Sequence, residues 1–160
     1  MRSNKLFTIV AICLLPTLFC NCKIFQSSSN ICNKTCTELK ITQTNLLSFQ
    51  RYTYTIGANK LIIDSLYNFY SESKQIFSKT LSPDEFCTLM KYVPKIMKLN
   101  DSYKNSDIID GTDEEVLILN DSTVVKKIRI SNVKVVLLDS LYSEINNHIT
   151  DGRKKIIKFY

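Results

Sequence analysis

The chain has 160 residues, enough for one domain of ordinary size. Hydrophobic residues make up 44% and charged residues 22%, with three glycines and three prolines. This composition excludes a disordered or fibrous protein. The formal net charge of +6 is a modest excess that is usual for solubility. Together with the leader described next, it argues against a nucleic-acid partner.

The first 21 residues have the parts of a secretory signal peptide. Arg2 and Lys5 give a positive start, and an apolar core follows from Leu6 to Phe19. A core of 14 residues is shorter than the roughly 20 needed to cross a bilayer. We therefore predict a signal peptide over residues 1–21 and export of the rest. An uncleaved membrane anchor is the weaker alternative.

Two cysteines stand where the apolar core ends. In a bacterial lipoprotein, the cysteine after such a core becomes the new amino terminus and carries acyl chains such as palmitate. Cys22 follows Asn21 and Cys20 follows Phe19, so neither follows the Gly, Ala or Ser that the lipobox pattern prefers. Asn is the more tolerable neighbour, so we predict lipidation at Cys22, with Cys20 as the runner-up. Ordinary cleavage after Cys22 is a further alternative.

The segment after Cys22 is polar and lacks periodicity. Residues 23–45 are rich in Ser, Asn, Thr and Gln, a composition that does not bury enough apolar surface to fold alone. We therefore expect a flexible polar tether over residues 22–48 and a single head domain over 49–160. Such a tether would hold the head off the membrane, with the acyl chains as the membrane contact.

The remaining cysteines and the single histidine limit the possible chemistry. Cys32 and Cys36 are four residues apart and form a possible disulfide in an oxidising compartment. Cys87 lies in a helical pattern and is expected to be a small buried apolar residue. His148, near a predicted helix end, is expected to cap carbonyls or face solvent. The sequence therefore predicts no metal site, no cofactor and no catalytic residue.

The first half of the head is predicted to be mainly strands. Residues 49–56, FQRYTYTI, alternate between apolar and polar side chains, and the turn residues 57–59 lead into a returning strand at 60–64. This is the signal of a β-hairpin. Further strands are plausible within 65–70 and at 75–79.

A helix start follows at TLSPDEF. Ser82 is placed as the N-cap, Pro83 at the first helical position and Glu85 where a capping box requires it. Pro94 is expected to end or kink this helix. The apolar stripe at helical spacing consists of Phe86, Leu89, Met90, Val93 and Met97.

A second hairpin and a second helix complete the head. Residues 115–119 and 123–130 flank the turn residues 120–122. A helical stripe then ends near Asp151, and residues 154–160 form a last strand or a frayed tail. The stripe consists of Leu138, Leu141, Tyr142, Ile145 and Ile149. The predicted fold is α+β, a mostly antiparallel sheet of four to six strands with two main helices packed on one face.

Five acids gather between the helix and the second hairpin, at Asp107, Asp110, Asp113, Glu114 and Glu115. Their spacing is not that of a calcium-binding EF-hand loop, which needs acids at alternate positions with a glycine at the sixth. We interpret them as a possible acidic interaction loop rather than a metal site.

The leader, the polar tether and four segments of the head, LSPDEFCTLMKYV, IIDGTDEEVLIL, KKIRISN and LLDSLYSEIN, together resemble small uncharacterised lipoproteins exported by Bacteroidetes-type bacteria. The resemblance covers most of residues 50–149. It implies a location in the periplasm or at the outer membrane, and it carries over no catalytic residue.

The leading hypothesis is a lipid-anchored cell-envelope protein that is not an enzyme and binds a protein or another envelope component. An immunity-type protein that neutralises a toxin is the first alternative, with the five acids as its interface. An envelope enzyme built on carboxylates is the second, and it predicts at least two acids in a buried cleft. A secreted viral or eukaryotic protein ranks below the bacterial interpretations.

Overall fold

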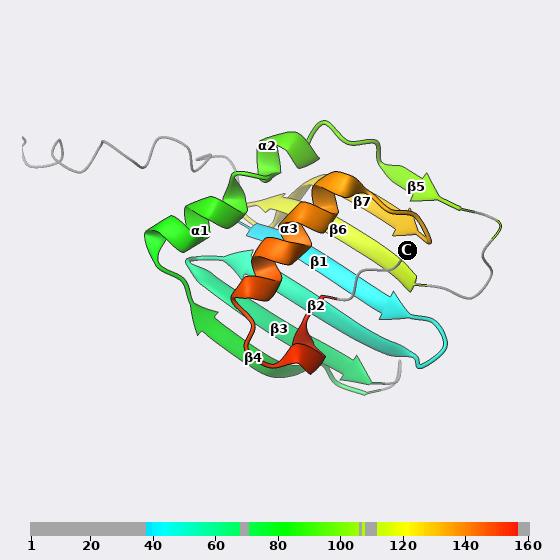
Figure 1. Cartoon of the computed structure of the whole chain (residues 1–160), viewed down its shortest axis with the longest axis horizontal. Coiled ribbons are helices and arrows are strands. Elements are labelled where there is room, and N and C mark those ends of the chain that lie inside the picture. Colours follow the sequence, from blue (N-terminus) through cyan, green and yellow to red (C-terminus); the bar gives the residue numbers. More distant parts are fainter. Residues whose placement is uncertain (1–37, 68–70, 106, 108–111, 157–160) are drawn as a thin grey trace, which may run out of the picture. The chain divides into compact units, whose positions relative to one another are not determined.

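The computed structural model describes residues 38–67, 71–105, 107 and 112–156. These ranges contain seven strands, three α-helices and one short 3-10 helix (Figure 1). The strands are β1 (Glu38–Asn45), β2 (Gln50–Gly57), β3 (Lys60–Tyr67), β4 (Lys74–Thr80), β5 (Ser102–Lys104), β6 (Thr112–Asn120) and β7 (Thr123–Ser131). The helices are α1 (Pro83–Met90), α2 (Val93–Ile96), α3 (Val136–Asn147) and the 3-10 helix η1 (Gly152–Lys154). The class is α+β, as predicted, but the strands outnumber the four to six expected.

All seven strands belong to one sheet, in the order β4-β3-β2-β1-β6-β7-β5. Every neighbouring pair is antiparallel except the edge pair of β5 and β7, which is parallel. Both predicted hairpins are confirmed. Their two-residue turns place Ala58 and Asn59, and then Asp121 and Ser122, at positive φ. A two-residue turn needs this conformation to match the twist of the two strands that it connects.

The central strand of the sheet is the segment that the sequence assigned to the tether. β1 lies between β2 and β6, so the prediction of a tether through residue 48 was wrong from Glu38 onward. Only Leu39 and Ile41 are buried aliphatic residues in β1, and Gln43 replaces the third. Two apolar residues give only a weak alternating pattern in the sequence. The strand is stabilised instead by its pairing with a neighbouring strand on each edge. The three-residue strand β5 was also not predicted.

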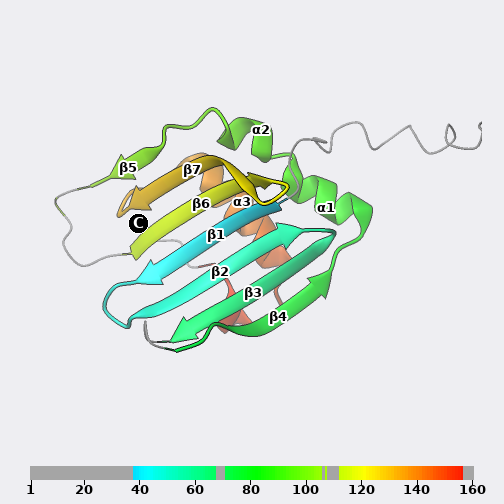
Figure 2. The ribbon, with the colours of Figure 1, turned by 180° about the vertical axis from the view of Figure 1, so that it is seen from behind.

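The three α-helices cover one face of the sheet, as Figures 1 and 2 show from opposite sides. Between the two layers lies a core of aliphatic residues from every long strand except β4 and from all three helices. The predicted stripe of α3 is buried. The predicted stripe of the first helix is wrong at Met97, which is 42% exposed, because the helix ends at Met90 and restarts at Val93 before Pro94. That break changes the helical phase and buries Ile96 instead.

The opposite face of the sheet, which we call the open face, carries no helix within the described part of the chain (Figure 2). Side chains alternate between the two faces of a strand, so β1 and β2 place a group of threonines here. These are Thr42, Thr44, Thr53 and Thr55, all partly exposed. Separately, none of the described helices is long and apolar enough to span a bilayer.

Candidate functional site

One hollow of the described residues lies on the open face. It has a volume of about 560 Å³ and extends over β1, β2, β5, β6 and β7. Its polar lining includes Thr42, Thr44, Arg51, Thr53, Tyr103, Lys104, Asp113, Glu115 and Arg129. A hollow of this size and lining suits a polar ligand or the side chains of a protein partner better than a lipid or a flat aromatic cofactor.

Charges on the open face are largely paired across strands. The Glu115 Oε2 atom lies 2.5 Å from Lys127 Nζ and 3.9 Å from Arg129 Nε. The hydroxyls of Thr42 and Thr53 are 3.3 Å apart. Partly exposed pairs of this kind contribute little to stability, so the surface offers both donors and acceptors to a ligand at little structural cost.

The predicted acidic loop does not exist as one cluster. Asp113, Glu114 and Glu115 all border the hollow on the open face, but the Glu114 carboxylate points to the helix side of β6, where it accepts from Tyr142. Asp107 is exposed in a turn, and Asp110 lies outside the described residues. The sequence grouped these acids by proximity along the chain, but a strand sends successive side chains to opposite faces.

Glu114 is held by two hydrogen bonds beneath the sheet. The Gln43 amide donates to its Oε1 at 2.7 Å, and the Tyr142 hydroxyl donates to its Oε2 at 2.6 Å. Burial raises the pKa of Glu114 above its usual range, although both hydrogen bonds oppose that rise. Burial and the nearby Glu114 also raise the pKa of Tyr142 well above its usual value.

A carboxylate enzyme would need a second acid and a cleft beside Glu114. The nearest candidate, Asp139, lies 3.4 Å from Lys134 Nζ. The hollow that Asp139 and Glu114 both line has a volume of about 10 Å³, which admits at most one water molecule. The small hollow that Glu114 shares with Asp139 therefore has no room for a substrate beside both acids.

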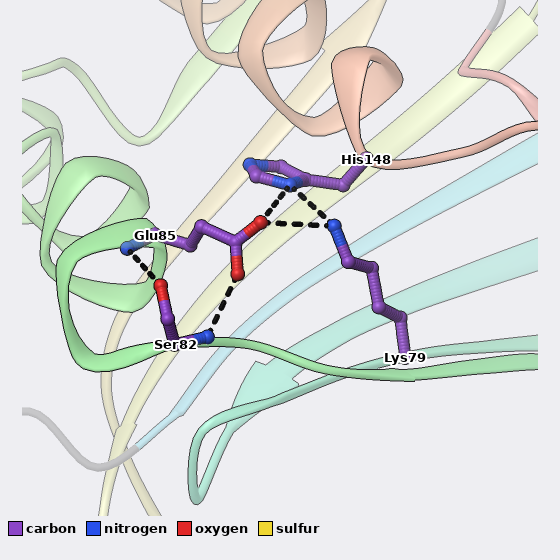
Figure 3. Close-up of polar contacts among 4 residues, drawn as sticks. All are labelled: Lys79, Ser82, Glu85 and His148. Atoms are coloured by element: carbon purple, nitrogen blue, oxygen red, sulfur yellow. Dashed lines mark hydrogen bonds and ion pairs between the residues drawn. The ribbon is translucent and has the colours of Figure 1, made fainter.

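His148 joins a second polar cluster, which connects β4, α1 and the end of α3 (Figure 3). Its Nδ1 atom lies 3.1 Å from Lys79 Nζ and 3.4 Å from Glu85 Oε1, and the Lys79 ammonium donates to that same oxygen at 3.0 Å. The prediction that His148 caps carbonyls or faces solvent was wrong, because its side chain is only 10% exposed. The contacts with Lys79 span 69 residues, so no local signal announces them.

The predicted capping box of α1 is confirmed and belongs to the same cluster. Ser82 Oγ accepts from the Glu85 backbone N–H at 3.2 Å, and the Glu85 carboxylate accepts from the Ser82 backbone N–H at 2.7 Å (Figure 3). The Ser82 N–H and the Lys79 ammonium lower the pKa of Glu85 to about 2. The Nε2 atom of His148 is buried and has no hydrogen-bond partner among the described residues, so the polar contacts of this side chain are those of Nδ1 with β4 and α1.

Cys87 is disulfide-bonded, which corrects the expectation of a plain buried apolar residue. The chain has six cysteines, and the other five precede β1. The helical pattern around Cys87 carries no sign of this bond, so the sequence did not indicate it.

The lipidation candidates Cys22 and Cys20, and the predicted disulfide pair Cys32 and Cys36, lie outside the described residues. Among the residues that are described, no group of three or more His, Cys, Asp and Glu side chains is arranged to hold a metal ion. No protein-family model matches the sequence, and no curated protein is significantly similar to it.

Proposed function

We propose that this protein is a lipid-anchored binding module of the bacterial cell envelope, and that it binds its partner through the open face. One observation carries the binding part of the proposal. The open face is a hollowed, polar sheet surface that the described helices leave uncovered, while the opposite face forms the core. Antiparallel sheets tolerate a solvated face, and rigid strands position its side chains for recognition.

The anchoring part of the proposal rests on the leader and on Cys22. The disulfide at Cys87 supports it, because stable disulfides are characteristic of exported proteins in oxidising compartments. Two alternatives have less support. The acids of an immunity-type interface are divided between two faces of the sheet, and the hollow that Glu114 shares with Asp139 has a volume of only about 10 Å³.

Intact mass tests the anchor. Protein from the membrane fraction of a bacterial host should begin at Cys22 and carry acyl chains, and a Cys22→Ser variant should lose them. An unacylated mass for the unsubstituted protein would contradict the anchor.

Photo-crosslinking tests the binding face. A photoreactive amino acid replaces Thr53, which lines the hollow, or Ser140, which is exposed on α3 in the helix layer. We expect a discrete crosslinked envelope partner from position 53 and none from position 140. The proposal fails if position 53 gives no product, or if both positions give the same products.

A further inference from the structure

Four large apolar side chains are exposed together at one end of the sheet. Leu46, Leu47 and Phe49 in the β1–β2 turn are 38%, 71% and 56% exposed, and Tyr67 at the end of β3 is 69% exposed. Tyr67 pairs with Gln50, the residue directly after Phe49. We call these four residues the apolar tip. Exposed apolar side chains that gather in this way mark a surface that another phase or molecule covers.

The turn that carries the tip places an aromatic residue in a backbone conformation that turns usually give to Gly or Asn. Phe49 has a φ of 51°, a conformation that Gly or Asn adopts at far lower cost than an aromatic residue. No charged residue occurs from Asn45 to Gln50. The Asn45 Oδ1 atom accepts from the backbone N–H groups of Leu47 and Ser48, both at 3.0 Å. The turn thus satisfies these donors internally, as a backbone entering an apolar phase must do.

We propose that the apolar tip inserts into the surface of the same bilayer that holds the acyl chains on Cys22. Leucine and phenylalanine enter the boundary between headgroups and acyl chains, and tyrosine keeps its hydroxyl at the headgroup level. Acyl anchors commonly act with a second membrane contact. The tip provides such a contact.

The length of chain before β1 supports the bilayer as the occupant. The tip follows the end of β1, whereas the chain from Cys22 joins at its start, Glu38. The strand rises about 3.3 Å per residue, so the two ends lie about 25 Å apart. Glu38 follows Cys22 by 16 residues, and the tether expected from the sequence would, at that length, have a root-mean-square span of about 22 Å. The span and the distance match, which is the condition for two linked contacts to reinforce each other.

This inference rests on the proposed anchor, so its test measures insertion of the tip separately from acylation of Cys22. The chain contains no tryptophan, so Leu47→Trp places a single tryptophan at the tip, and its emission can be excited apart from that of the tyrosines. Val124→Trp is the matched control, because Val124 is 49% exposed and pairs with Leu119, which lies beside Glu38 at the other end of the sheet. Both mature proteins are incorporated into vesicles of phosphatidylethanolamine and phosphatidylglycerol, with ordinary or brominated acyl chains.

We expect the emission of the Leu47→Trp protein to shift to the blue in vesicles and to be quenched severalfold by brominated chains. The Val124→Trp protein should show neither effect. Leu46→Trp, at the same turn, should respond like Leu47→Trp and guards against a local distortion. Emission from the tip that is the same with and without vesicles, or equal quenching of tip and control, would overturn the inference. Intact mass of the same samples reports independently whether the protein is acylated. If it is not, the unacylated protein is mixed with the vesicles, and tryptophan emission and quenching are measured in the same way.

Discussion

The two faces of the sheet are made by alternate residues of the same strands, yet they have different tasks. On the helix side, Ile41 is fully buried in a continuous aliphatic core. On the open face, its neighbour Thr42 lines a polar hollow. The comparison teaches that stability and recognition are separated here by one residue along the chain. Substitutions on one face should therefore change the free energy of unfolding, and those on the other should change binding.

The largest effect is expected from the covalent link to the helix layer. Cys87→Ala, or reduction of the disulfide, should lower the free energy of unfolding by about 4 kcal/mol, because the bond restricts the conformations of the unfolded chain. Urea unfolding with and without reductant measures this loss. A midpoint that does not change on reduction would show that the bond does not stabilise the head.

The comparison of the faces is sharpest at two adjacent residues of β1. Ile41→Ala removes buried methyl groups and should cost about 3 kcal/mol. Thr42→Ala removes only a contact with the Thr53 hydroxyl and should cost less than about 1 kcal/mol. Urea unfolding of both variants measures the difference. Similar losses would mean that the open face is itself packed against something in the native protein.

Glu114 is an ionisable side chain on the otherwise aliphatic helix side of the sheet, and it should make the free energy of unfolding fall as pH rises. Its pKa is raised in the folded state, so the folded protein holds a proton that the unfolded chain has released above its usual pKa of 4.5. Below pH 4.5 the carboxyl is protonated in both states and costs no stability. The loss of stability grows as pH rises through the folded pKa, because the buried carboxyl must then give up its proton. Glu114→Gln should flatten the decline between weakly acidic and neutral pH in thermal unfolding. An unchanged pH profile would contradict the assignment.

A small effect is also expected at the α1 cap. Ser82→Ala should cost about 1 kcal/mol, the usual loss for an N-cap hydroxyl. Glu85 has the opposite pH dependence to Glu114, because its pKa is lowered to about 2. It stabilises the fold above its usual pKa, and that contribution disappears as pH falls toward 2. Glu85→Gln should therefore reduce the loss of stability in acid, as measured by unfolding at a series of pH values.

Local signals predicted the elements that local chemistry determines. The capping residues Ser82 and Glu85 fixed the start of α1, and alternation with turn residues revealed both hairpins. β1 was missed because its stability comes from β2 and β6 on either side, and its own apolar residues are few. Periodicity reports one segment at a time, so a strand that depends on two neighbours gives a weak signal.

The candidate sites were harder to predict than the fold. Lys126 alternates in phase with the buried Ile128 and Ile130 of β7, yet its ammonium donates to the Leu99 carbonyl at 2.7 Å and pairs with Asp101. A register shift between Ile118 and Leu119 lies beside it. The cluster around His148 and the hollow on the open face both join segments far apart in sequence. A single sequence does not show which distant segments meet in the fold. Only the alternation of side chains along each strand could have indicated which residues lie on the open face.

The central position of β1 has a consequence for the order in which the protein can fold. Its partner β2 follows directly, but β6 begins at Thr112, 67 residues after β1 ends at Asn45. Since synthesis proceeds from the amino end, the hairpins of β1 to β4 can form while one edge of β1 has no partner. Unpaired central edges are templates for aggregation. The nascent chain is therefore most vulnerable before β6 emerges, and a chaperone that covers β1 during that interval would protect the whole fold.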